Sequence, residues 1–128
     1  MIDLSTIKSV DHAERPILHP VTGEETGAFI TLASPDHPAR KQAIADVSRR
    51  LREAGEGQDA ELLEEMNTEA IAASVLGWRG IKMDGQELQF SPAAAREQLA
   101  RKEMRWLRSQ IADQLARREN FIVTSAPG

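Results

Sequence analysis

The distribution of apolar residues along the chain predicts strands at the N-terminus and helices in the remainder. Apolar and β-branched side chains dominate residues 28–33, which is typical of a strand. Pro16 and Pro20 bias the residues before them towards an extended backbone, so this segment is extended as well. A glycine-containing link separates the two segments. Residues 1–33 are therefore predicted to be β-rich, with a β-hairpin or small sheet.

From residue 36 onward, apolar residues recur at helical spacing. Ile44, Val47 and Leu51 follow the i, i+3, i+7 pattern of one helix face. Ser34 or Asp36 could cap this helix, since short polar side chains accept hydrogen bonds from the free amides of a first turn.

A second helical stretch begins after Asp59, which is a suitable N-cap, and is predicted to end at Gly77. Ile71 and Val75 widen its apolar face. The Asn67-Thr68 pair could divide the stretch into two shorter helices.

The last helical stretch begins at Ser91-Pro92, where a hydroxyl cap precedes a proline in the first turn. No glycine or proline interrupts residues 93–120, so the helix is predicted to extend to about residue 121. Its apolar stripe consists of Met104, Leu107, Ile111 and Leu115.

The connector GWRGIKMDGQELQFSP, residues 77–92, separates these last two helical stretches. Its Asp84-Gly85 pair predicts a small hairpin over residues 80–90, because both turn residues tolerate positive φ. Trp78 and Phe90 have two interpretations: they pack in the core and set the angle between helices, or they form an exposed anchor for a partner.

These elements predict an α+β, mainly helical fold. An N-terminal β-hairpin or small sheet would precede three to four helices, with the Asp-Gly hairpin between helices. We expect a single domain over residues 1–122, β-rich over 1–33 and helical over 36–121, followed by a flexible tail, 123–128.

Composition narrows the class of protein. The 128 residues include no cysteine, which excludes disulfides, thiolate metal sites and cysteine nucleophiles. No apolar run approaches the roughly 20 residues needed to span a bilayer, and the acidic start is unlike a secretory signal. We therefore expect a protein of the cytoplasm that is not secreted and does not bind a membrane.

Charge and aromatic content argue against nucleic-acid binding. The formal net charge is -4, and acidic residues interrupt the basic positions of the last helix. Aromatic residues make up 4% of the chain, few for a module that stacks bases.

No catalytic arrangement emerges from the motifs. His12, His19 and His37 fall in the irregular N-terminal region at spacings that match no defined metal site. Gly77 and Gly80 lack the context of a phosphate-binding loop. We expect no enzymatic activity, no metal and no cofactor.

A family resemblance points to a role. The connector resembles the W-x-G-[IV] … G-x-x-[LV]-x-F-S block of tail assembly chaperones from long-tailed, siphovirus-like bacteriophages. The matching residues are Trp78-Arg79-Gly80-Ile81, Asp84-Gly85 and Leu88-Gln89-Phe90-Ser91-Pro92. Pro20-Val21-Thr22-Gly23 and Gly27-Ala28-Phe29-Ile30 are similar to the N-terminal strand pair of that family.

The resemblance implies a phage- or prophage-encoded protein of the host cytoplasm that binds the tape-measure protein, keeps it soluble and assists tail-tube assembly. The tail-tube protein and a second copy of the chain could be further partners. An alternative is a tail-completion or connector protein retained in the virion.

Helix-in-groove binding would suit a tape-measure protein, which presents long amphipathic helices. The candidate partner-binding residues are those of the apolar stripes and the connector, although each stripe could equally be core. They are Trp78, Phe90, Ile71, Val75, Met104, Leu107, Ile111 and Leu115.

Overall fold

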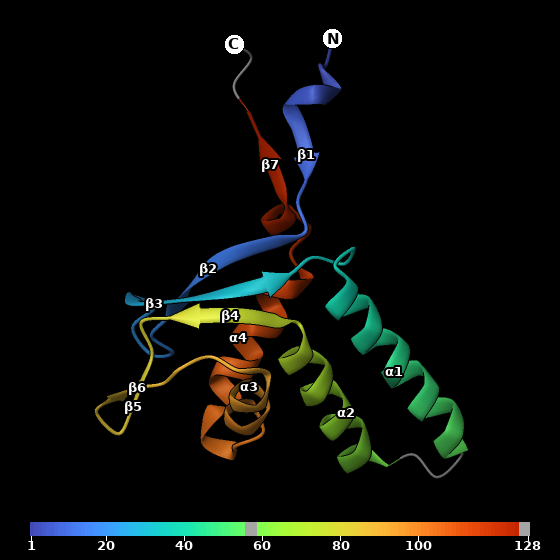
Figure 1. Ribbon diagram of the computed structural model, residues 1–128, viewed down its shortest axis with the longest axis vertical. Coiled ribbons are helices and arrows are strands. Elements are labelled where there is room, and N and C mark those ends of the chain that lie inside the picture. Colours follow the sequence, from blue (N-terminus) through green and yellow to red (C-terminus); the bar gives the residue numbers. More distant parts are fainter. Residues whose placement is uncertain (56–58, 126–128) are drawn as a thin grey trace.

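The computed structural model describes residues 1–55 and 59–125 of the chain (Figure 1). Residues 56–58, which include part of the glycine-containing link after the first predicted helix, lie outside the described residues, as do residues 126–128.

A three-stranded antiparallel sheet forms the centre of the fold. Its strands are β2 (His12–Leu18), β3 (Glu25–Ala33) and β4 (Val75–Arg79), in the order β2-β3-β4. The register places Ile30 opposite Arg15 on one side and Trp78 on the other. Because side chains alternate along a strand, Ile30 and Leu32 point to the core and Phe29 to the other face.

Four α-helices accompany the sheet: α1 (Pro38–Ala54), α2 (Ala60–Ala73), α3 (Pro92–Leu99) and α4 (Arg105–Ala116). Helices α3 and α4 lie behind the sheet in Figure 1, whereas α1 lies beside α2 and away from α4. The core joins both layers, since Ile71, Leu99 and Ile111 belong to the same buried cluster as Ile30 and Leu32. Short 3-10 helices precede and follow these elements: η1 (Leu4–Thr6), η3 (Lys102–Met104) and η4 (Arg118–Phe121).

Two small strand pairs complete the fold. β1 (Ile7–Ser9) pairs with β7 (Ile122–Thr124), and this ribbon projects with both ends of the chain at the top of Figure 1. The predicted tail, 123–128, therefore begins inside a strand, while its last residues, 126–128, lie outside the described part. β5 (Lys82–Met83) and β6 (Gln86–Glu87) form a hairpin whose turn residues, Asp84 and Gly85, have φ of 53° and 80°.

The predicted fold class is wrong. The structure is α+β with 51% helix and 25% strand, so it is not mainly helical, and strands follow the helices as well as precede them. The main cause is β4, where the sequence pattern suggested the end of a helix and a connector. Gly77 within this segment and Gly80 just after it disfavour a helix, and hydrogen bonding to β3 makes the segment a strand of the sheet.

Two helix boundaries also differ from the predictions. His37 caps α1 through its ring, which accepts a hydrogen bond from the amide of Ala39, whereas Ser34 accepts one from the amide of Asp36. The expected helix to residue 121 is broken after Leu99, where Arg101 takes an extended conformation with ψ of 140°. Neither glycine nor proline causes this break. The break allows α3 and α4 to bury Leu99 and Ile111 in the same core.

Candidate partner-binding surfaces

Four of the eight predicted partner-binding residues are buried within the chain itself. Ile71, Val75, Ile111 and Leu115 belong to the hydrophobic core cluster, each no more than 8% exposed. The sequence left open whether each apolar stripe belongs to the core or binds a partner. In this conformation these four side chains belong to the core.

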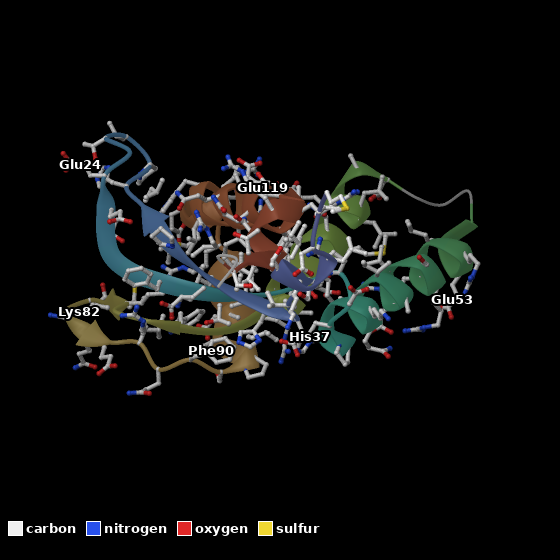
Figure 2. The ribbon with its side chains drawn as sticks, turned by 90° about the horizontal axis from the view of Figure 1, so that it is seen from above. Glu24, His37, Glu53, Lys82, Phe90 and Glu119 are labelled. Atoms are coloured by element: carbon white, nitrogen blue, oxygen red, sulfur yellow. The ribbon has the colours of Figure 1, made fainter. Side chains whose placement is uncertain are left out.

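Trp78 and Phe90 contact each other and are half-buried. Their ring centroids lie 5.0 Å apart with an interplanar angle of 87°, an edge-to-face arrangement. The indole of Trp78 donates a hydrogen bond of 2.8 Å to the carbonyl of Leu88. Trp78 thus fixes the segment after β6 against β4, and Phe90 lies at its far end, along the lower edge of Figure 2.

Three of the predicted residues meet at one apolar pocket, which we call the aromatic–methionine pocket. Its volume is about 240 Å³, and Lys82 is the charged side chain in its lining. Trp106, at the first turn of α4, is 36% exposed, so the pocket is open to solvent on this side. The main apolar lining residues are Trp78, Ile81, Met83, Met104, Trp106 and Leu107.

The backbone of two distant segments sets the position of this pocket. A Cβ built on Gly80 would lie 2.7 Å from the carbonyl oxygen of Gly27, so β3 and the end of β4 approach each other as only glycine permits. On the other side, the break after Leu99 brings Met104 and Trp106 to the pocket. Arg108 stabilises this break, because its guanidinium donates to the carbonyl of Leu99 at 2.9 Å.

Two lining residues, Met83 and Trp106, lay outside the predicted partner-binding set. Met83 lies in the β5–β6 hairpin, and Trp106 lies off the apolar stripe of its helix. A tryptophan beside the helical stripe was the available signal, because tryptophan is enriched at the energetic centres of protein interfaces.

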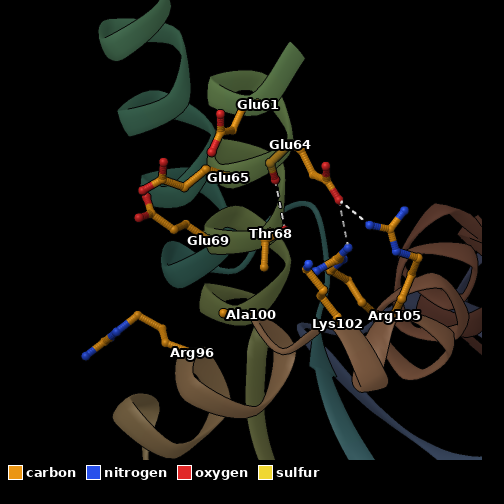
Figure 3. Close-up of a pocket in the computed structure, with 11 residues that line it drawn as sticks. Glu61, Glu64, Glu65, Thr68, Glu69, Arg96, Ala100, Lys102 and Arg105 are labelled. Atoms are coloured by element: carbon orange, nitrogen blue, oxygen red, sulfur yellow. Dashed lines mark hydrogen bonds and ion pairs between the residues drawn. The ribbon is translucent and has the colours of Figure 1, made fainter. Parts of the chain in front are cut away.

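A second groove is lined by opposite charges and has a volume of about 480 Å³ (Figure 3). Helix α2 contributes four carboxylates, and α3, η3 and α4 contribute four cationic side chains. Oε1 of Glu64 accepts hydrogen bonds from Arg105 at 3.0 Å and from Arg108 at 3.1 Å. These contacts link α2 to α4. The remaining charged lining residues are Glu61, Glu65, Glu69, Arg96 and Lys102.

A third groove, of about 360 Å³, lies between α1 and α2, and we call it the arm groove. Its lining is apolar except for Ser48 and Asn67. Two of its large side chains are unusually exposed: Ile44 by 54% and Leu63 by 44%. Neither belonged to the predicted partner-binding set.

The histidines serve local structure. Nδ1 of His19 accepts hydrogen bonds from the amides of Val21 and Thr22 in the turn before β3, and His37 caps α1. The imidazole of His12 contacts the carboxylate of Asp11, and this hydrogen bond lowers the pKa of Asp11. Within residues 1–55 and 59–125, no group of three or more His, Cys, Asp or Glu side chains could hold a metal ion.

On the outer face of the sheet, Glu14 and Arg79 form an ion pair with two hydrogen bonds, of 2.7 and 3.1 Å. The guanidinium also lies over the ring of Phe29, 4.0 Å from its centroid. The hydrogen bonds from Arg79 lower the pKa of Glu14. This cluster joins β2, β3 and β4.

None of the helices in the described ranges is both long enough and apolar enough to cross a bilayer.

Comparison with known families relates the chain to a family of prophage proteins. The sequence model of the YdaY prophage protein family matches residues 36–125, from the turn before α1 to the end of β7. This match covers more than half of the chain, so the protein belongs to the YdaY prophage protein family. Comparisons with curated proteins and with solved structures give no match.

Proposed function

We propose that this prophage protein is a non-enzymatic tail assembly chaperone that binds the tape-measure protein and assists assembly of the tail tube. One observation of the structure carries the proposal: an open apolar pocket at which Trp78, Met104 and Leu107 meet. Membership of a prophage family and the resemblance of the connector to tail assembly chaperones support the phage context.

The chemistry of the pocket suits a partner that is apolar and helical. Tryptophan supplies a large contact area, and the flexible thioethers of Met83 and Met104 adapt to side chains of different shape. Polar groups that would orient a small substrate are few in the lining: Thr26, Lys82 and Gln98. The pocket therefore favours the shielding of an apolar surface over catalysis.

Co-expression with the tape-measure protein of the same prophage tests the proposal. We expect the tape-measure protein to aggregate alone, to remain soluble with the wild-type chain and to co-purify with it. Trp106→Glu places a charge at the mouth of the pocket and should lower the soluble fraction several-fold. The matched control is Leu4→Glu, because Leu4 is 77% exposed, belongs to η1 near the N-terminus and is not a lining residue of the pocket.

Circular dichroism and thermal melting should show that both variants fold. An insoluble tape-measure protein in the presence of the wild-type chain contradicts the chaperone role. Equal effects of Trp106→Glu and Leu4→Glu contradict the assignment of the pocket. Mass spectrometry of purified particles gives a separate test: stoichiometric amounts of the chain in finished virions would favour a structural morphogenesis protein instead.

A further inference from the structure

We propose that the arm groove binds a second kind of surface: an amphipathic helix whose apolar stripe is flanked by acidic residues. The arm groove is separate from the aromatic–methionine pocket, and the two share no lining residue. The inference goes beyond the proposed function, because it does not require the occupant to belong to the tape-measure protein.

Helix α1 forms an arm that packs on α2 and is anchored to the rest of the fold near its first turn. There Arg40 donates hydrogen bonds to the carbonyls of Ala33 and Leu115, at 3.1 and 2.9 Å. Beyond this anchor, Ala43 is the buried residue of the helix. The second half of α1 therefore depends on its contact with α2, and the apolar side chains at the edge of that contact are incompletely covered.

The floor of the arm groove is apolar along two helices. Ile44 and Val47 contribute from α1, and Leu63, Met66 and Ala70 contribute from α2. Within each helix the spacing is three or four residues, so each set forms one continuous stripe. A groove between two parallel stripes is the geometry that accepts an amphipathic helix.

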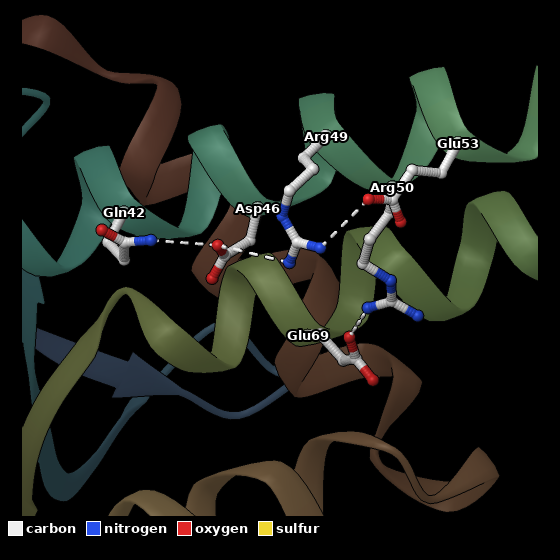
Figure 4. A network of polar contacts seen from close by, with 6 residues as sticks. All are labelled: Gln42, Asp46, Arg49, Arg50, Glu53 and Glu69. Carbon is white, nitrogen blue, oxygen red and sulfur yellow. Dashed lines mark hydrogen bonds and ion pairs between the residues drawn. The ribbon is translucent and has the colours of Figure 1, made fainter.

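The other edge of the α1–α2 contact is closed by paired charges (Figure 4). Arg49 bridges Asp46 and Glu53 along α1, at 3.8 and 3.4 Å. Arg50 reaches across to Glu69 of α2 and forms an ion pair with it. All charged side chains drawn on this edge have a partner of opposite sign, so it offers little to a charged ligand.

The edge of α1 beside the arm groove has a different character. Lys41, Ser48 and Arg52 follow the i, i+7, i+11 spacing of one helical stripe, and Ser48 itself lines the groove. Lys41 and Arg52 are exposed, and neither side chain forms an ion pair with another residue within 1–55 and 59–125. At a rise of about 1.5 Å per residue, the two cations are roughly 16 Å apart along α1.

The lining of the arm groove includes no carboxylate. A helix lying in it would place its apolar stripe on Ile44 and Leu63 and one flank beside Lys41 and Arg52. Acidic residues on that flank, about three turns apart, would complement both cations, while basic residues would be repelled. Helix α2 of a second copy, although acidic, offers no such stripe along its length, because its apolar side chains Met66, Ile71 and Ala72 are buried.

The test uses two synthetic amphipathic helices with the same leucine stripe. One carries glutamate on both flanks and the other carries lysine at the same positions. Fluorescence anisotropy with the full chain at low salt should show the glutamate peptide binding about tenfold or more tightly than the lysine peptide. High salt should reduce this ratio towards one, because exposed charges are screened.

Variants locate the binding to the arm groove. Lys41→Glu should lower the glutamate-to-lysine preference by about three- to tenfold, since it replaces an attraction by a repulsion. The matched control is Lys8→Glu on β1, an exposed lysine far from α1, which should leave the preference unchanged. Ile44→Glu should weaken both peptides, and its 54% exposure in the wild type favours retention of the fold.

Three outcomes would overturn the inference: equal affinity for the two peptides, no binding at millimolar peptide, or the same response to Lys8→Glu as to Lys41→Glu. No phage protein takes part in this assay. Its failure would therefore leave the co-expression result for the tape-measure protein intact, and a failure of co-expression would leave the peptide result intact.

Discussion

Replacing Gly80 by alanine tests the close approach that positions the aromatic–methionine pocket. Gly80 has φ of +75°, and an added Cβ would lie 2.7 Å from the carbonyl oxygen of Gly27 and 3.2 Å from Cα of Ala28. Both neighbouring atoms belong to the backbone of β3, so a side-chain rotation cannot relieve the contact.

Two effects contribute to the expected loss of stability. A non-glycine residue in the left-handed region costs about 1–2 kcal/mol, and the smaller entropy of the unfolded alanine chain offsets roughly 0.4–1 kcal/mol of it. The forced shift of β3 adds about 1–3 kcal/mol, the usual cost of overpacking. Gly80→Ala should therefore destabilise the chain by roughly 2–4 kcal/mol.

Gly23→Ala is the matched control, because Gly23 has the same φ of +75° and no atom within 4 Å of an added Cβ. Gly23→Ala should lower the free energy of unfolding by about 1 kcal/mol or less, because it carries the cost of a positive φ but no overpacking. Urea unfolding followed by circular dichroism gives both free energies of unfolding. Equal losses for the two variants would refute the close approach of Gly80 to Gly27, and with it the account of how the pocket is positioned.

Two further predictions concern the polar contacts that join the elements. Arg79 lowers the pKa of Glu14 in the folded chain, so the Glu14–Arg79 ion pair stabilises the fold while Glu14 is ionised. This stabilisation is fully present above the unfolded-state pKa of about 4.3, and it is lost as the pH falls through the lower folded-state pKa. The stability difference between wild type and Glu14→Gln, measured by urea unfolding, should therefore shrink between about pH 7 and about pH 2.5, and a constant difference would contradict the pairing. Arg40→Lys should cost about 1–2 kcal/mol, because a lysine cannot hold the carbonyls of Ala33 and Leu115 together as the planar guanidinium does; an unchanged unfolding midpoint would contradict this role.

Local signals in the sequence predicted the hairpins but not the third strand of the sheet. The Asp84-Gly85 turn and the two extended segments, predicted over 16–20 and 28–33 and observed as β2 and β3, depend on residues close together in the chain. The strand from Val75 to Arg79 depends on pairing with β3, which lies on the far side of two helices in sequence. No short-range pattern encodes that pairing, and Gly77 within the strand and Gly80 just after it weakened the strand's own signal.

The sequence identified several of the apolar residues of the candidate site, but it did not show which of them face solvent. The apolar stripes of α2 and α4 were visible from their spacing, but spacing cannot separate a stripe that faces the sheet from one that faces a partner. The sheet itself decides the question: it covers Ile71 and Ile111, whereas Met104 lies in η3 at the open pocket. The break after Leu99 had no sequence signal, because it is stabilised by Arg108, a residue of the following helix.

The aromatic–methionine pocket is built by residues on both sides of the boundary of the family match. The match begins at residue 36, after β2 and β3, yet Ile17 and Ala28 of these strands line the pocket together with Trp78 and Leu107. Within the matched part, β4 has its hydrogen-bonding partner in β3, outside that part. The contact of Gly80 with Gly27 crosses the same boundary. A change in the N-terminal hairpin should therefore move one wall of the pocket, even where it leaves the matched residues untouched. Under the proposed function, such a change would weaken co-purification of the tape-measure protein.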